Sequence, residues 1–130
     1  MAWNKFINKD EIKVKVTNET VLFAQEFGTY LGQDGGKGEK HLTTNQLRKF
    51  FGEVKRQELN GYDPTEFILL KPKLAYAVGR DKNTTKIKDF YKVMSNAIDA
   101  VTNENEFNNF IKIFEAIVAY HKASEENANI

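Results

Sequence analysis

Apolar side chains recur at intervals of three and four residues through long parts of this sequence, including residues 85–101 and 106–121. This period matches the 3.6 residues per turn of an α-helix and places the apolar side chains on one face. Residues 106–121 carry a second apolar stripe at Ile113, Ala116 and Tyr120. That wider face predicts a helix central either to the core or to an oligomer contact. Such faces are buried only against other elements, so we expect a helical bundle.

Two further segments show the same period. Residues 43–59 place Leu47, Phe50, Phe51 and Val54 on one face, and either Thr43 or Thr44 is a suitable N-cap. Residues 19–32 also predict a helix, although Gly28 lowers its helix propensity.

A helix start with several agreeing signals occurs at Asp63-Pro64. Asp63 is a suitable N-cap, Pro64 would occupy the first helical position, and Glu66 the third. Pro72 then interrupts the pattern, because proline lacks an N–H group and restricts the residue before it. Either one helix kinks there or two short helices meet, and both versions place Lys71 at a bend and exposed.

The remaining segments lack helical periodicity. Residues 33–41 predict a mobile glycine-rich loop, and residues 1–18 predict a flexible start. Within that start, residues 12–16 alternate and predict either a lone edge ribbon or a frayed helix entry. The loop does not fit a nucleotide-binding loop, since Leu31 occupies the required glycine position and Gly38 follows the lysine.

These elements fit one domain. The chain has 130 residues with 41% hydrophobic and 28% charged residues, as in ordinary soluble proteins. It contains no cysteine, which excludes disulfides and thiolate metal sites. The amino terminus has no apolar signal core, and no apolar stretch is long enough to cross a membrane. We therefore expect a cytoplasmic, all-α protein whose residues 1–130 form a single compact bundle of about five helices.

The net charge of +1 conceals an uneven distribution. Residues 37–92 contain thirteen Lys/Arg and seven Asp/Glu, whereas residues 93–130 contain two Lys and six Asp/Glu. A basic block beside an acidic segment indicates a surface that binds polyanions, although uneven charge also arises by chance.

Cations in the basic block follow helical spacing. Within residues 43–59, one face opposite the apolar stripe would carry Arg48, Lys49, Lys55 and Arg56. Lys73, Tyr76 and Arg80 would share another face, with an aromatic ring between two cations, an arrangement that suits single-stranded nucleic acid. The alternatives are an ordinary solvated surface for the first face and a core position for Tyr76, which has apolar neighbours in the sequence.

Catalytic signals are absent from the sequence. His41 and His121 lie eighty residues apart, and His121 ends an apolar stripe, which favours a structural role. No cluster has metal-ligand spacing, and no serine lies in a nucleophile elbow. We expect no enzymatic activity, no metal and no cofactor.

Four segments together resemble the small helical subunit of type III-A CRISPR effector complexes, the Csm small subunit family: "LTTNQLRKFF" (42–51), "KPKLAYAVGR" (71–80), "IKDFYKVMSNAID" (87–99) and "FNNFIKIFEAIVAYHK" (107–122). The resemblance implies an all-helical, non-enzymatic RNA-binding protein. It also implies that several copies stack along a guide RNA and its single-stranded target RNA, beside other subunits of a ribonucleoprotein that serves antiviral defence.

The resemblance also implies RNA-binding residues. Arg48 and Lys49 fall in the first motif, and Lys71, Lys73 and Arg80 fall in the second. The face argument adds Lys55 and Arg56, and Lys40 is added for its place in the basic loop. The alternative is a protein-only adaptor, in which the aromatic helix over residues 106–121 mediates dimerisation.

Overall fold

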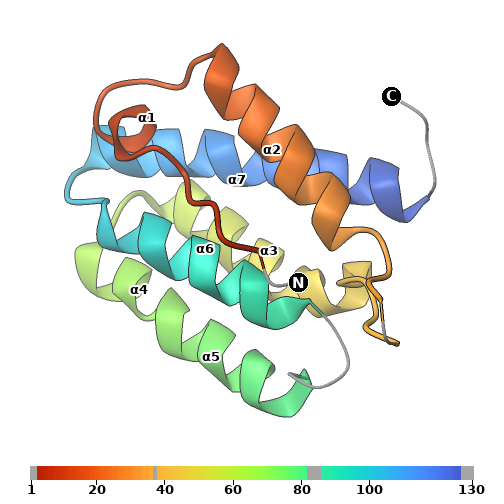
Figure 1. The fold of residues 1–130 in the computed structure, drawn as a ribbon. Coiled ribbons are helices and arrows are strands. Elements are labelled where there is room, and N and C mark those ends of the chain that lie inside the picture. Colours follow the sequence, from red (N-terminus) through yellow and green to blue (C-terminus); the bar gives the residue numbers. More distant parts are fainter. Residues whose placement is uncertain (1–2, 37, 82–85, 127–130) are drawn as a thin grey trace.

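Helices form most of the part that the computed structural model describes, which is residues 3–36, 38–81 and 86–126 (Figure 1). In chain order they are α1 (Lys9–Lys13), α2 (Asn18–Leu31), α3 (Thr44–Asn60), α4 (Pro64–Ile68), α5 (Leu70–Asp81), α6 (Ile87–Asp99) and α7 (Glu104–Glu125). No β-strand occurs among the described residues. The predicted compact all-α bundle is therefore confirmed.

Side-chain caps determine where two of these helices begin. Thr43 is the N-cap of α3, and it forms a reciprocal capping box with Gln46. Asp63 caps α4 by accepting hydrogen bonds from the backbone N–H groups of Thr65 and Glu66, with Pro64 at the start of the helix. Both starts match the sequence prediction, because these capping groups satisfy N–H donors that have no partner inside the helix.

The chain around Pro72 forms two helices. The helix α4 ends at Ile68, Leu69 is its C-cap, and α5 begins at Leu70. Pro72 thus lies in the first turn of α5, where a missing N–H leaves no intrahelical hydrogen bond unmade. Lys71 was predicted to be exposed, which is wrong: its side chain is only 27% exposed, and its Nζ lies 2.7 Å from Asp99 Oδ1.

The N-terminal segment contains a short helix instead of a ribbon. Residues 9–13 form α1, so the alternation over residues 12–16 corresponds to the end of a short helix. Ile7 and Ile12 are buried, and Asn109 Nδ2 donates to the Ile12 carbonyl at 2.8 Å. The flexibility of residues 1–18 stays a prediction, and residues 1 and 2 lie outside the described part.

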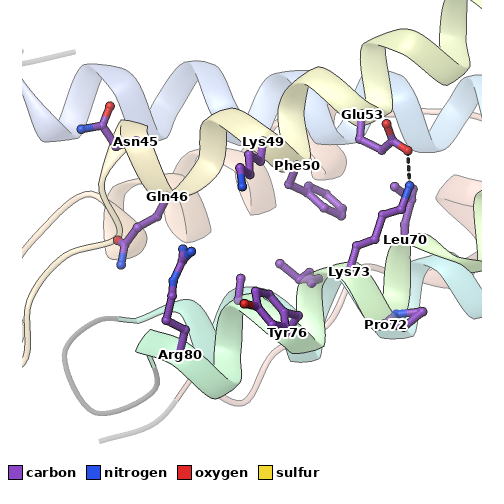
Figure 2. A pocket seen from close by; sticks show the side chains of 12 residues that line it. Asn45, Gln46, Lys49, Phe50, Glu53, Leu70, Pro72, Lys73, Tyr76 and Arg80 are labelled. Atoms are coloured by element: carbon purple, nitrogen blue, oxygen red, sulfur yellow. Dashed lines mark hydrogen bonds and ion pairs between the residues drawn. The ribbon is translucent and has the colours of Figure 1, made fainter.

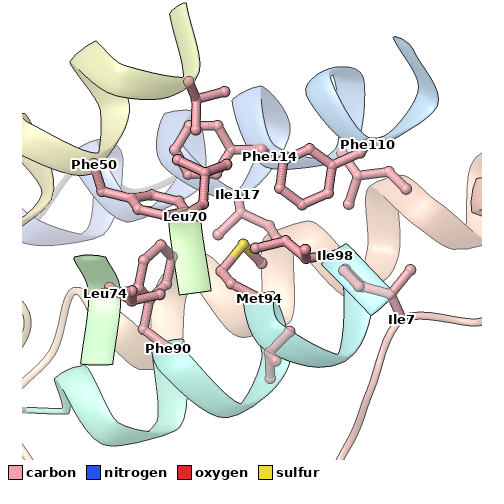
Figure 3. Packing of buried hydrophobic residues seen from close by; sticks show 14 of the residues in the cluster. Ile7, Phe50, Leu70, Leu74, Phe90, Met94, Ile98, Phe110, Phe114 and Ile117 are labelled. Atoms are coloured by element: carbon pink, nitrogen blue, oxygen red, sulfur yellow. The ribbon is translucent and has the colours of Figure 1, made fainter. Parts of the chain in front are cut away.

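The core is centred on α7, which contacts α1, α2 and α3 (Figure 1). Phe110 and Phe114 of α7 are almost fully buried, and Phe114 meets Phe50 of α3 edge-on with the ring centroids 5.5 Å apart. Phe90 and Met94 of α6 lie on the other side of this cluster (Figure 3). The helix over 106–121 is therefore central to the core, one of the two roles that its wide apolar face predicted.

Glycine allows α2 to approach α7 closely. A Cβ atom built on Gly28 would lie 2.7 Å from the Ile117 carbonyl oxygen and 2.7 Å from Tyr120 Cβ. Gly32, one turn later, would place a Cβ 2.8 Å from the His121 carbonyl oxygen. Gly28 thus lowers the local helix propensity and at the same time permits the contact that seats α2 on the core.

Hydrogen bonds shape the loop between α2 and α3. The Gly35 N–H donates to the Glu39 carbonyl at 2.8 Å, and the His41 N–H donates to Asp34 Oδ1 at 2.9 Å. The Lys40 carbonyl accepts from the Lys86 N–H at 3.2 Å. The mobility of residues 33–41 stays a prediction.

Across the described residues, every helix is too short or too polar to traverse a bilayer.

Candidate nucleic-acid interface

A groove runs between α3 and α5 on the outside of the bundle (Figure 2). Its volume is about 690 Å³, and we call it the α3–α5 groove. From α3 it is lined by Asn45, Gln46, Lys49, Phe50 and Glu53, and from α5 by Leu70, Pro72, Lys73, Leu74, Tyr76, Ala77 and Arg80. The groove therefore combines cations on its rim with an apolar floor.

Helical geometry explains why these side chains meet. Phe50 turns inward from α3 toward the core, and Leu74 does the same from α5. The neighbouring positions of each helix then face the space between the two helices. Figure 2 shows Lys49 pointing into the α3–α5 groove from α3 and Arg80 pointing into it from α5. Two cations that are far apart in the sequence thus face one space.

Glu53 is a carboxylate that lines the α3–α5 groove. It accepts from Arg56 Nε at 2.9 Å and from Arg56 Nη2 at 2.8 Å, and it also pairs with Lys73 Nζ (Figure 2). The hydrogen bonds from Arg56, followed by those from Lys73, lower the pKa of Glu53 to about 2. The carboxylate is therefore ionised near neutral pH and offsets part of the charge on these two cations.

Tyr76 lies on the solvent side of the groove. Its side chain is 75% exposed, so its interpretation as a core residue is wrong. The buried positions of α5 are Leu70 and Leu74, and Tyr76 lies two residues beyond the second of these, on a different face. Lys73, Tyr76 and Arg80 do line one face, as their spacing predicted.

Lys55 and Arg56 of α3 point to different neighbours. Lys55 Nζ lies 2.6 Å from Glu115 of α7 and 2.8 Å from Glu58, and these hydrogen bonds raise the pKa of Lys55. Arg56 pairs with Glu53 beside the groove and lies 3.2 Å from Glu66 of α4. The predicted basic face of α3 is thus divided between the α7 side and the groove side.

Arg48, Lys40 and Lys71 lie outside the lining of the groove. Arg48 and Lys40 are exposed, and like Lys49 they make no ion pair with any residue that the structure describes. Lys71 is held by Asp99 of α6. Of the eight predicted residues, the groove therefore brings together Lys49, Lys73 and Arg80, which line it, and Arg56 joins them through Glu53.

The sequence did not point to three parts of the groove: Asn45, Gln46 and the apolar floor. Asn45, Lys49 and Glu53 are four residues apart and so share a stripe on α3. That spacing could have predicted the wall of the groove that α3 forms. The opposite wall could not be assigned, because periodicity does not say which helix lies beside α3.

One cation of the basic block is buried in the interior of the bundle. Lys86 is 4% exposed, donates to the Tyr30 carbonyl at 2.7 Å, and has its Nζ 3.7 Å from the centroid of the Tyr30 ring. Burial lowers the pKa of Lys86. The Tyr30 hydroxyl donates to Asp89 at 2.5 Å, and burial followed by this bond raises the pKa of Tyr30. This cation therefore belongs to the α2–α6 contact and not to the surface charge.

The histidines have structural partners. His121 is 1% exposed, its Nε2 donates to the Leu42 carbonyl, and burial lowers its pKa. His41 bridges Asp34 at 2.8 Å and Glu125 at 3.3 Å. Within residues 3–36, 38–81 and 86–126, no group of His, Asp and Glu side chains could hold a metal ion.

The fold and this surface define an all-helical protein with a cation-lined groove between two helices. Residues 15–127 match the model of the family described as Csm2 Type III-A. The match covers most of the chain, so the chain belongs to this family, whose members are subunits of type III-A CRISPR complexes. No curated protein and no solved structure matches the chain.

Proposed function

We propose that the chain is a non-catalytic RNA-binding subunit of a type III-A CRISPR ribonucleoprotein. Several copies stack along the guide RNA and its single-stranded target, beside the other subunits, and serve antiviral RNA interference in the cytoplasm. The observation that carries the proposal is a set of exposed cations on α3 and α5, in a chain of this family: Arg48, and the groove-lining residues Lys49, Lys73 and Arg80.

The chemistry of the proposed contact is electrostatic. Lysine and arginine neutralise phosphates and release condensed counterions, which gives affinity without sequence preference. Pairing between guide and target supplies the sequence discrimination, as in other RNA-guided systems. With four phosphate contacts, the slope of log K against log salt for single-stranded RNA is about −3. Binding then weakens about 50-fold between 50 and 200 mM salt.

Ion pairs on this surface do not prevent phosphate binding. Lys73 and Arg56 both pair with Glu53, and their side chains are 52% and 47% exposed. Because these two cationic side chains are about half exposed, a phosphate can contact them from the solvent side. Arg48 and Lys49 have no such partner among the described residues and are the strongest contact candidates.

The non-catalytic role is supported by the chemistry of the α3–α5 groove. Its carboxylate, Glu53, has a pKa of about 2 and is held by two cations. A general base works best with a pKa near the operating pH, and a carboxylate this acidic is a weak proton acceptor at neutral pH. Among the described residues, no histidine lines the groove.

The protein-only adaptor is less well supported. It required aromatic side chains of residues 106–121 at a protein interface, but Phe107, Phe110 and Phe114 are each at most 2% exposed. Tyr120 packs beside Gly28 of α2. The face that predicted dimerisation is thus already buried inside the bundle.

Charge reversal tests the proposal. Fluorescence anisotropy would measure binding of a labelled single-stranded oligoribonucleotide to the purified chain at fixed low salt. We expect Arg48→Glu/Lys49→Glu to weaken binding at least tenfold, because two phosphate contacts become repulsive. The matched control is Lys112→Glu/Lys122→Glu, which makes the same charge change on exposed positions of α7. Equal binding by both double variants would place the contact elsewhere, and circular dichroism checks that helicity is unchanged.

A further inference from the structure

The α3–α5 groove offers more than a track for phosphates, because its floor is apolar and aromatic. Phe50 and Leu74 are buried beneath it, and Pro72 lies on its α5 side. Its volume of about 690 Å³ falls in the range of pockets that bind small organic groups. A site that only neutralised phosphates would need no such floor.

Tyr76 lines the groove above this floor, and its aromatic ring is accessible to solvent. Its side chain is 75% exposed, more than any other large hydrophobic side chain of α5. No hydrogen bond or ring contact joins it to another described residue. A large ring held in solvent beside an apolar hollow presents a π-face on which a nucleobase can stack.

The cations around Tyr76 are spaced for a nucleotide. Lys73 and Arg80 lie three residues before and four residues after Tyr76 on α5, which is about 4.5 and 6 Å along the helix axis. Lys49 faces the same space from α3 (Figure 2). A base seated on Tyr76 would therefore have positive side chains toward both of its flanking phosphates.

We propose that the α3–α5 groove is a nucleobase subsite in which Tyr76 stacks one unpaired base of single-stranded RNA, while Lys49 and Arg80 hold the adjacent phosphates. This inference rests on the proposed function and adds to it a preference for unpaired over paired RNA. Bases inside a duplex are stacked on their neighbours, so their faces are not available to a protein ring. The subsite has no base identity preference, because every base has a π-face.

The charge of the groove favours RNA over a protein occupant. Among the described residues, three cations line it against one carboxylate, and that carboxylate is itself paired with Lys73 and Arg56. An apolar peptide would cover the floor but would supply no anionic groups to these cations. A polyanion with flat rings satisfies both features at once.

Two changes test the subsite together, one in the protein and one in the RNA. The protein variants are Tyr76→Ala, which removes the ring, and Tyr76→Phe, which keeps it. Because Tyr76 is 75% exposed, neither change disturbs the core. The probes are a single-stranded oligoribonucleotide, the same oligonucleotide with abasic positions, and an RNA duplex of equal length, each measured by anisotropy with the full chain.

We expect Tyr76→Ala to weaken binding of the single strand about tenfold, the loss of one base stack, with an unchanged salt slope. Tyr76→Phe should bind like the parent. The parent should bind the abasic strand about tenfold more weakly, and Tyr76→Ala should cause little further loss there, because the two changes remove one contact. The duplex should be insensitive to Tyr76→Ala.

The contradicting results separate the two proposals. If Tyr76→Ala binds the single strand as well as the parent, while Lys49→Glu weakens binding, RNA is held by phosphate contacts and the subsite is overturned. If Tyr76→Ala weakens the abasic strand as much as the intact strand, the ring does not stack a base, which also overturns it. If the parent chain binds none of the three probes, the proposed function falls as well.

Discussion

Replacing Gly28 with alanine should destabilise the protein, although helix propensity alone predicts the opposite. Alanine is favoured over glycine inside a helix by about 1 kcal/mol. At Gly28, however, the added Cβ would lie 2.7 Å from the Ile117 carbonyl oxygen and 2.8 Å from the His121 backbone nitrogen. Two of the atoms that it meets are backbone, so α2 and α7 must separate to admit a methyl group.

The expected magnitude follows from these two opposing effects. Overpacking a well-packed contact costs about 1–3 kcal/mol, and the backbone neighbours at Gly28 favour the upper part of that range. Subtracting the propensity gain of about 1 kcal/mol leaves a loss of about 1–2 kcal/mol in the free energy of unfolding. For a chain of this size, that loss lowers the melting temperature by about 3–8 °C.

Gly52 provides the matched control. It lies in α3, it is exposed, and a Cβ built there meets no atom within 4 Å. Gly52→Ala should therefore raise the free energy of unfolding by about 0.5–1 kcal/mol. Urea denaturation followed by circular dichroism measures both variants, and equal m-values show that the midpoint shift reports stability. If Gly28→Ala stabilises the chain as Gly52→Ala does, the close α2–α7 contact is refuted.

Two other variants test the electrostatics of the groove and the interior. Glu53→Gln should tighten RNA binding several-fold, because it removes the carboxylate that holds Lys73 and Arg56. The control Glu58→Gln should have little effect on RNA binding. Fluorescence anisotropy measures both variants, and weaker binding by Glu53→Gln would contradict this prediction. The free energy of unfolding should fall between pH 7 and 5.5, because burial lowers the His121 pKa from 6.5 and the unfolded chain then binds protons first. Urea titrations at both pH values measure this loss of stability, and His121→Gln should reduce the loss more than His41→Asn does. If the loss is unchanged in His121→Gln, another titrating group causes it.

Local sequence signals predicted most of the fold. The three-and-four spacing placed the helices that became α2, α3, α6 and α7, because a buried stripe needs only its own period to be recognised. Capping residues at Thr43 and Asp63 located two starts, since a cap is a contact within a few residues. The short helix α1 was not predicted, because five residues are too few to show a period.

Contacts between distant segments set the features that were not predicted. The apolar neighbours of Tyr76 suggested burial, but α5 lies at the surface and buries Leu74 instead. Lys55 was assigned to a common basic face, yet it pairs with Glu115, sixty residues away. Gly28 lowers local helix propensity, and only the position of α7 shows why a side chain would not fit there. In each case the deciding neighbour belongs to another helix.

Salt dependence is the most direct test of the claim that cations beside the α3–α5 groove hold RNA phosphates. The measurement is the affinity of the chain for a single-stranded oligoribonucleotide from 50 to 200 mM salt, compared with that of Arg48→Glu/Lys49→Glu. The account predicts a slope of about −3 for the parent and a slope shallower by about 1.4 for the variant, because two phosphate contacts are lost. A parent slope near zero, or the same slope in the variant, would contradict it.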